Sequence, residues 1–249
     1  MMAIEIKGLC YTFPDGSPGV RDLNLSVKRG EFIVIAGENG SGKTTLCRHL
    51  NGLLKPAAGE VWLNGMSVKK NTVRARQLVG LLFQNADTQI VGESVYRDVA
   101  FGPENLKLKR VEIDRRTRQA LQTVGLTDRE NHRPHALSGG EKKRLAIAGV
   151  LAMRPEILVF DEPFSNLDYP SSIQIREQIQ TLHRENRTIL VVTHELEKVI
   201  DLATRLIIMK EGTIVEDGNP AGVVPLVEQY GVRAPCSCRF GLGVRSWLS

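Results

Sequence analysis

The chain has 249 residues, of which 42% are hydrophobic and 24% charged, and its formal net charge is +5. This balance is ordinary for a globular protein and allows a sizeable buried core. No stretch approaches the ~20 apolar residues that a transmembrane helix requires. No long basic run indicates nucleic acid as a partner, and short clusters such as Lys142–Arg144 are interpreted as solvated helix faces.

Cysteine usage and the first residues indicate the compartment. The cysteines at positions 10, 47, 236 and 238 fit neither a disulfide framework nor a zinc site, so we expect a reducing cytoplasm. Residues 1–7 lack the features of a signal peptide. Any role at a membrane would therefore depend on a partner.

The first predicted elements are strands. Residues 4–11 alternate weakly, residues 13–19 form a turn, and residues 23–27 alternate as a half-buried strand does. Residues 32–36 are continuously apolar, which is typical of a strand buried on both faces.

The next segment is a candidate phosphate-binding loop. It reads Gly37-Glu38-Asn39-Gly40-Ser41-Gly42-Lys43-Thr44, the G-x-x-x-x-G-K-T pattern, between the strand and a predicted helix over residues 45–50. Glycines let backbone N–H groups approach phosphate oxygens, and the helix N-terminus favours negative charge. Lys43 would reach the β- and γ-phosphates, Thr44 would contact Mg²⁺, and Thr45 would contact a phosphate. The alternative is a glycine-rich turn that matches the pattern by chance.

Two aromatic residues ahead of this loop are candidates for stacking on an adenine ring. Phe13 is the first candidate and Tyr11 is its rival. Phe13 could equally be an apolar anchor of its turn.

The middle of the chain turns from strands to helices. Residues 61–63 predict a strand entering a hairpin turn, and residues 78–83 predict a buried strand that ends at Gln84. From about residue 85 to 153 the pattern is helical, with helix-spaced apolar positions over 111–124 and 141–153.

A second polar constellation follows two more buried strands. Residues 157–160 predict a strand that delivers Asp161 and Glu162, and residues 189–192 one that ends beside His194. At this edge of an open sheet an aspartate can hold Mg²⁺ and a glutamate can activate a water that attacks a γ-phosphate. The alternative for the two acids is an N-cap of the next helix. Helices are predicted over 171–185 and 195–203, and a hairpin over 206–209 and 213–216.

Strands alternating with helices predict an α/β fold with a mostly parallel core sheet and an antiparallel sheet at its side. Together with the loop at 37–44, this is the pattern of a P-loop NTPase. From Gly231 the chain has three arginines, no acidic residue and no clear period, so we expect residues 231–249 to be a poorly structured basic tail.

The most selective motif is Leu137-Ser138-Gly139-Gly140-Glu141, between the glycine-rich loop and Asp161-Glu162. In this order the motifs resemble those of ATP-binding cassette (ABC) ATPases. The resemblance covers residues 1–230, with the helical subdomain at about 85–153, and implies ATP and Mg²⁺ as cofactors. It implies that the signature at 137–141 faces the P-loop of a second subunit. It also implies that Gln84 contacts Mg²⁺ and water, that Asp168 lies at the dimer interface, and that His194 contacts the γ-phosphate and the attacking water, beside Glu162 as the catalytic carboxylate.

A narrower resemblance is to the energy-coupling factor (ECF) ATPases. It rests on residues 84–91, on 98–105, and on Pro134–Leu137 running into 141–153. It implies an ATPase subunit, paired with an identical or paralogous ATPase and with transmembrane subunits, at the cytoplasmic face of the cell membrane. The cargo would be a micronutrient: a cobalt or nickel ion, or a vitamin. The tail does not resemble the ECF ATPases' C-terminal region.

Two alternatives stay open at this point. A soluble ABC ATPase acting on ribosomes or DNA usually has two cassettes or a long coiled coil, and this chain shows neither. An ATPase subunit of another ABC transporter class would not share the segment after Gln84. Within that segment Ile90, Val91, Val95, Val99 and Phe101 either pack inside the helical subdomain or line a groove for a membrane partner.

Overall fold

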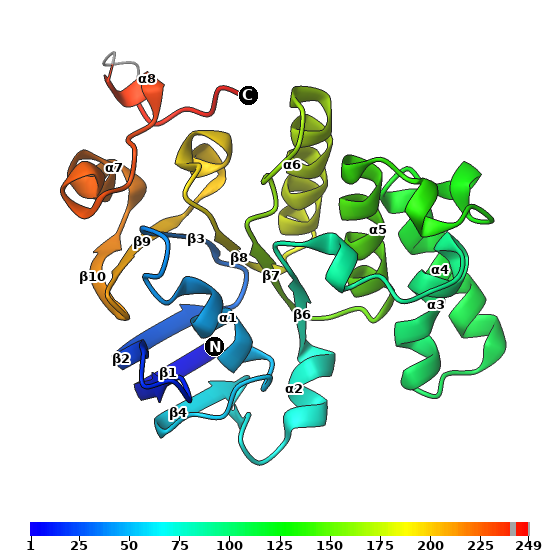
Figure 1. Ribbon diagram of the computed structural model, residues 1–249, viewed down its shortest axis with the longest axis horizontal. Helices are drawn as coiled ribbons and strands as arrows, with labels where there is room; N and C mark the ends of the chain where they lie inside the picture. Colours follow the sequence, from blue (N-terminus) through cyan, green and yellow to red (C-terminus); the bar gives the residue numbers. More distant parts are fainter. Residues whose placement is uncertain (240–242, 249) are drawn as a thin grey trace.

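The computed structural model describes residues 1–239 and 243–248 and contains two sheets (Figure 1). The first is antiparallel, with order β2-β1-β4-β5, and comprises β1 (Met2–Thr12), β2 (Pro18–Lys28), β4 (Ala58–Leu63) and β5 (Met66–Ser67). The second has order β10-β9-β3-β8-β7-β6 and is parallel except for β10. Its strands are β3 (Phe32–Ala36), β6 (Val79–Leu82), β7 (Ile157–Asp161), β8 (Thr188–Val192), β9 (Arg205–Lys210) and β10 (Thr213–Gly218). The predicted α/β class with an antiparallel side sheet is confirmed.

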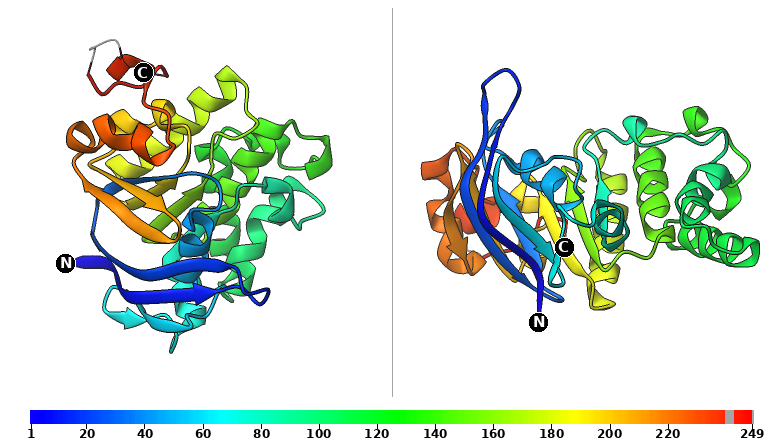
Figure 2. Two further views of the ribbon diagram at one scale, coloured as in Figure 1. Left: turned by 60° about the vertical axis from the view of Figure 1, so that its left-hand side comes forward. Right: turned by 90° about the horizontal axis from the view of Figure 1, so that it is seen from below.

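The helices divide between the two faces of the core sheet. They are α1 (Lys43–Leu50), α2 (Thr72–Leu78), α3 (Val95–Asn105), α4 (Arg110–Thr123), α5 (Gly139–Ala152), α6 (Tyr169–Arg184) and the short α7 (Pro220–Val223) and α8 (Cys236–Arg239). Leu46 and Leu50 of α1 are buried in one cluster with residues of both sheets, so α1 lies between the sheets. On the other face, α5 and α6 bury their apolar residues against β7 and β8. Figure 2 shows α3, α4 and α5 grouped on the side away from the antiparallel sheet.

Two predicted elements differ in the structure. Residues 195–203 form two 3-10 turns, Leu196–Lys198 and Ile200–Leu202, instead of one helix. The helix α2 was missed, because its segment is mostly polar and only Ala75 and Leu78 are buried. The α2 segment is short, so it offers too few apolar positions for a helical period to be recognised.

The tail also departs from its prediction over the described residues. Val232, Ala234 and Leu248 are buried, and the Trp247 ring stacks on Tyr169 with centroids 5.4 Å apart. The backbone N–H of Trp247 donates to the carbonyl of Glu197 at 3.2 Å. Apolar side chains at irregular spacing anchor this segment, and such anchoring produces no sequence period. Residues 240–242 and 249, part of the predicted tail, lie outside the described residues.

Among the described residues, none of the helices has the length and apolar character needed to cross a membrane.

Candidate active site

A cavity of about 330 Å³ lies at the carboxyl ends of the parallel strands β3, β7 and β8. Its lining combines the glycine-rich loop with residues of the β1–β2 hairpin and with side chains at the ends of β6, β7 and β8: Phe13, Pro18, Gly19, residues 39–45, Gln84, Asp161, Glu162 and His194. Segments far apart in the sequence meet here because the carboxyl ends of parallel strands share one edge of the sheet.

The glycine-rich loop is held in a conformation that depends on its glycines. Gly40 and Gly42 have φ of +82° and +96°, and a Cβ on Gly42 would lie 2.6 Å from the carbonyl oxygen of Gly19. The Lys43 ammonium donates to the carbonyls of Gly37 at 2.7 Å and Glu38 at 2.8 Å. These bonds fix the curl of the loop. Burial lowers the pKa of Lys43, while the charges of Glu162 and Asp161 oppose that shift.

The structure separates the two aromatic candidates. Phe13 lines the cavity, whereas Tyr11 does not. The Tyr11 ring packs edge-on against Phe13 at 5.1 Å and against His49 of α1 at 5.0 Å. Phe13 is therefore placed for stacking on a ligand in the cavity, and Tyr11 supports it.

Asp161, the last residue of β7, fits a magnesium ligand. Its carboxylate is 3% exposed, and its Oδ1 has no hydrogen-bond partner among the described residues. Burial raises the pKa of Asp161, and a hydrogen bond from the Thr44 side chain opposes that shift. A buried carboxylate oxygen beside a hydroxyl is the hard oxygen environment that Mg²⁺ prefers. Gln84, which is exposed and lines the same cavity, can add its amide oxygen.

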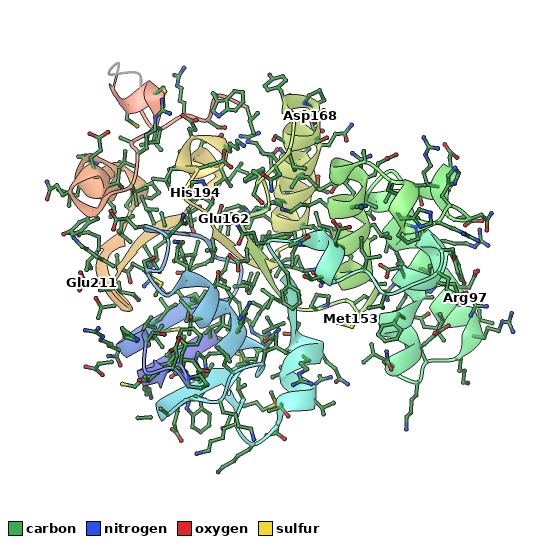
Figure 3. All side chains as sticks on the ribbon, viewed as in Figure 1. Arg97, Met153, Glu162, Asp168, His194 and Glu211 are labelled. Atoms are coloured by element: carbon green, nitrogen blue, oxygen red, sulfur yellow. The ribbon has the colours of Figure 1, made fainter. Side chains whose placement is uncertain are left out.

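Glu162 is buried and held from two sides. Its Oε1 lies 2.8 Å from the His194 Nδ1 and accepts from the His194 backbone N–H at 3.2 Å, while its Oε2 accepts from the Thr193 hydroxyl at 3.1 Å. Glu162 has φ of +49°, a left-handed conformation that is uncommon for a residue with a side chain. Figure 3 shows Glu162 and His194 side by side. Sequence reasoning missed Thr193, although its place between a strand end and His194 was visible.

The signature segment and Asp168 lie apart from this cavity. None of the residues 137–141 lines it. Ser138 caps α5: its hydroxyl accepts from the Glu141 backbone at 3.3 Å, and its backbone donates to the Glu141 carboxylate at 2.8 Å. Asp168 caps α6 by accepting from the Ser171 backbone at 3.0 Å, and Figure 3 shows it at the end of that helix. Ser138 and Gly139 are exposed, so the start of α5 can reach another molecule.

Lys143 corrects one sequence interpretation. Sequence reasoning assigned it to a solvated helix face, but it is 3% exposed, and its ammonium bonds the backbones of Gln84 and Glu162. A signal was present: position 143 lies three residues after Gly140 and four before Ile147, and all three are buried on α5. The basic neighbours of Lys143 concealed this periodicity.

The family model described as ABC transporter matches residues 20–165. The chain is 43% identical to the energy-coupling factor transporter ATP-binding protein EcfA of Methanothermobacter thermautotrophicus, over 93% of this chain and 76% of the relative. It is 42% identical to EcfA2 of Clostridium tetani, over 94% of this chain and 86% of the relative.

Solved structures of ABC ATPases are similar to this chain in fold. CbiO1 of Clostridium perfringens, part of the ABC transporter complex cbiONQ, has a TM-score of 0.82 at 36% identity, covering 92% of each chain. A dimeric ATP-binding cassette, MJ0796, bound to ADP and phosphate has a TM-score of 0.79 at 27% identity, covering 87% of this chain and 98% of that one. The chain therefore belongs to the ABC transporter family, as an ATPase that uses ATP with Mg²⁺ and is coupled to transmembrane transport.

Proposed function

We propose that this chain is the ATP-hydrolysing subunit of an ECF-type importer of a micronutrient, at the cytoplasmic face of the membrane. The single observation that supports the ECF assignment best is the identity of 43% to EcfA over 93% of the chain. The cargo that we favour is a cobalt or nickel ion, with a vitamin as the alternative, and this choice rests on sequence resemblance.

In the proposed site the chain's own residues divide the work on ATP. Phe13 stacks on the base, residues 37–45 bind the phosphates through backbone N–H groups and Lys43, and Thr44, Gln84 and Asp161 hold Mg²⁺. Bound Mg²⁺ neutralises phosphate charge.

Hydrolysis is assigned to the hydrogen-bonded pair Glu162 and His194, in which Glu162 is buried and the His194 side chain is 55% exposed. The Glu162 carboxylate orients and deprotonates the attacking water, and His194 contacts the water and the γ-phosphate. The hydrogen bonds from Thr193 and His194 fix the direction of the carboxylate, so little reorganisation is needed when the water is deprotonated.

We further propose that two ATPase subunits enclose two ATP molecules. The exposed Ser138 and Gly139 at the start of α5 supply a hydroxyl, backbone N–H groups and a positive helix end to the nucleotide of the other subunit. Asp168 lies at the same interface. The distance of the signature from its own cavity and the dimeric state of the MJ0796 cassette support this arrangement.

The contact with the transmembrane subunits is assigned to the region after Gln84. Val91 and Phe101 are exposed, while Val95 and Val99 are fully buried. Asp98 accepts from the backbones of Val91 and Gly92 at 2.7 and 2.8 Å, which holds this loop with Val91 outward.

A groove of about 350 Å³ includes Leu106, which caps the end of α3. It has apolar side chains from the ends of α2 and α5 and from the segment after α3 (Leu78, Leu106, Leu108 and Met153) and polar ones around them (Arg74, Gln77, Arg116, Arg154 and Glu156). An apolar floor with a charged rim suits a helix from a membrane partner.

The test is purification of the full chain from membranes of its own host, followed by identification of the co-purifying subunits and uptake of labelled cobalt, nickel and vitamins. Co-purification with another ATPase and transmembrane subunits, and uptake that requires ATP hydrolysis, are expected. Recovery with ribosomes or DNA would support the soluble alternative. Recovery with the membrane subunits of an exporter would replace the ECF assignment.

A further inference from the structure

One buried cation at the centre of the molecule has no part in the mechanism above. Lys143 of α5 directs its ammonium at three oxygen atoms on two loops, one after β6 and one between β7 and α6. It donates to the carbonyl of Gln84 at 3.0 Å, to the carbonyl of Glu162 at 2.9 Å and to the hydroxyl of Ser165 at 3.1 Å. A lysine ammonium has three N–H donors, so every donor has one acceptor.

The acceptors of Lys143 show that this residue does more than hold α5 in place. Ser165 also donates its hydroxyl to the Glu162 carbonyl, at 2.9 Å. Two side-chain donors therefore hold that carbonyl, together with the backbone N–H of Ser165 at 3.2 Å, on a residue with φ of +49°. A backbone in this region needs support from its surroundings. Because the orientation of the peptide unit after Glu162 limits where the side chain can point, the two donors help to aim the carboxylate.

The electrostatics of the site explain how a charged lysine can be buried there. Burial lowers the pKa of Lys143 to about 8, while the charges of Glu162, Asp161 and Glu195 favour the protonated form. Lys143 makes no hydrogen bond to any of those carboxylates; its bonds go to backbone and hydroxyl oxygens. The ammonium thus stabilises backbone geometry directly and offsets part of the local negative charge.

We infer that Lys143 is a positioning residue for ATP hydrolysis, which joins the signature helix α5 to the backbone of Gln84 and Glu162. Lys143 lies five residues after Ser138 on the same helix, so a displacement of α5 moves the donor that holds the Glu162 carbonyl. The segment proposed to contact the second subunit and the carboxylate that activates the attacking water in this subunit are therefore mechanically connected.

The substitution that isolates this role is Lys143→Met, which keeps the length and removes all three donors. We expect the kcat of ATP hydrolysis, per ATP-binding site, to fall at least tenfold, which corresponds to about 1.4 kcal/mol of transition-state stabilisation. The KM and the dissociation constant for ATP should stay within about threefold, because the nucleotide contacts at residues 37–45 are untouched. Lys143→Arg, which retains a buried donor group, should recover part of the kcat.

Lys142→Met is the matched control. Lys142 precedes Lys143 on α5 but forms a partly exposed ion pair with Asp87 at 2.8 Å. Its loss removes the same charge from the same helix and should leave kcat within about twofold.

The double variant Lys143→Met with Ser165→Ala tests whether the effect passes through the Glu162 carbonyl. If it does, the kcat of the double variant falls by less than the product of the factors by which the two single substitutions lower kcat. Independent effects that multiply would overturn the assignment, and so would a kcat for Lys143→Met equal to that of the wild type. If Lys143→Met does not fold, Ser165→Ala alone decides: it should lower kcat with ATP affinity unchanged, and an unchanged kcat contradicts the inference.

Discussion

At the residue scale, the candidate active site is a set of side chains whose hydrogen bonds leave little freedom. Thr193 and His194 hold the Glu162 carboxylate, and Lys143 and Ser165 hold its carbonyl. The residue is thus fixed at both ends in a backbone conformation that costs energy. The arrangement resembles preorganised catalytic sites in which the protein, not the substrate, sets the direction of the reactive group.

The first prediction concerns that carboxylate. Glu162→Gln should lower kcat by a factor of ~10²–10⁴ while ATP binding is retained, because an amide cannot act as a base. The amide also cannot accept from both Thr193 and His194, so we expect a loss of about 1–2 kcal/mol in the free energy of unfolding. Steady-state hydrolysis and nucleotide-binding assays measure the two effects. Glu185→Gln, at an exposed position, is the control, and wild-type turnover in Glu162→Gln would contradict the assignment.

A second residue links stability to pH. His49 of α1 is 1% exposed, and burial lowers its pKa from 6.5 to about 4. Between those values the unfolded chain binds a proton that the folded chain does not, so stability falls as the pH drops from about 6.5 to about 4. At 1.36 kcal/mol per pH unit the total loss approaches roughly 3 kcal/mol.

His49→Phe should reduce this loss, since the ring no longer titrates. Urea unfolding of both proteins between pH 4.5 and 7 provides the comparison. The exposed His135→Asn serves as the control and should keep the wild-type slope. The same slope in His49→Phe and the wild type would show that His49 is not responsible.

At the scale of elements, the start of α5 both exposes residues of the signature segment and packs tightly against α6. Its capping box exposes Ser138 and Gly139, while Gly140 is buried against α6: a Cβ there would lie 2.4 Å from the Ser171 hydroxyl. The tight contact places the start of α5 beside the start of α6, which Asp168 caps. The two helix starts therefore present one surface, which is the surface proposed for the second subunit.

Ser138→Arg tests that surface. The long cation should block ATP-dependent dimer formation in a Glu162→Gln background, while ATP binding by the monomer changes little. Size-exclusion chromatography with ATP gives the result. Ser138→Ala is the matched control, because it also removes the cap, at a cost of about 1 kcal/mol, without adding bulk. Dimer formation by Ser138→Arg at the level of Ser138→Ala would remove this surface from the interface.

At the scale of the whole molecule, the helices α3, α4 and α5 stand beside the core sheet (Figure 2), and the segment from Gln84 to the end of α3 exposes apolar side chains that the core does not use. Val91 is 63% exposed and Phe101 52% exposed. The residues of the same segment that face inward, Val95 and Val99, are completely buried, and Ile90 packs against the core cluster. The segment after Gln84 thus divides into inward positions and an outward surface.

Because Val91 faces outward and Ile90 faces inward, substitutions at these two positions should affect membrane assembly differently. Val91→Asp should fold and hydrolyse ATP normally but fail to co-purify with the transmembrane subunits, because the contact would bury an unpaired charge. Ile90→Asp should lose stability instead, since its side chain packs inside. Val111→Asp, at a site 82% exposed on α4, should leave assembly unchanged. Normal uptake with Val91→Asp would place the docking surface elsewhere.

The sequence by itself determined the parts whose chemistry is local. A strand, a run of glycines, a lysine and two hydroxyls occur within 14 consecutive residues, Phe32–Thr45, so the phosphate loop needed no long-range information. The strands that deliver Asp161 and His194 were predicted because strands buried on both faces read as continuous apolar runs. The order of the motifs then indicated the family.

Only the tertiary structure decided which residues meet across the chain. Lys142 and Lys143 are adjacent and chemically identical, yet one is in a partly exposed ion pair and the other is buried and bonded to the Glu162 carbonyl. Phe13 and Tyr11 were equivalent until the fold turned one of them toward the cavity. In both pairs the two side chains differ because elements distant in sequence pack around them. The outcome of that packing depends on the direction in which each side chain points and not on its chemical type.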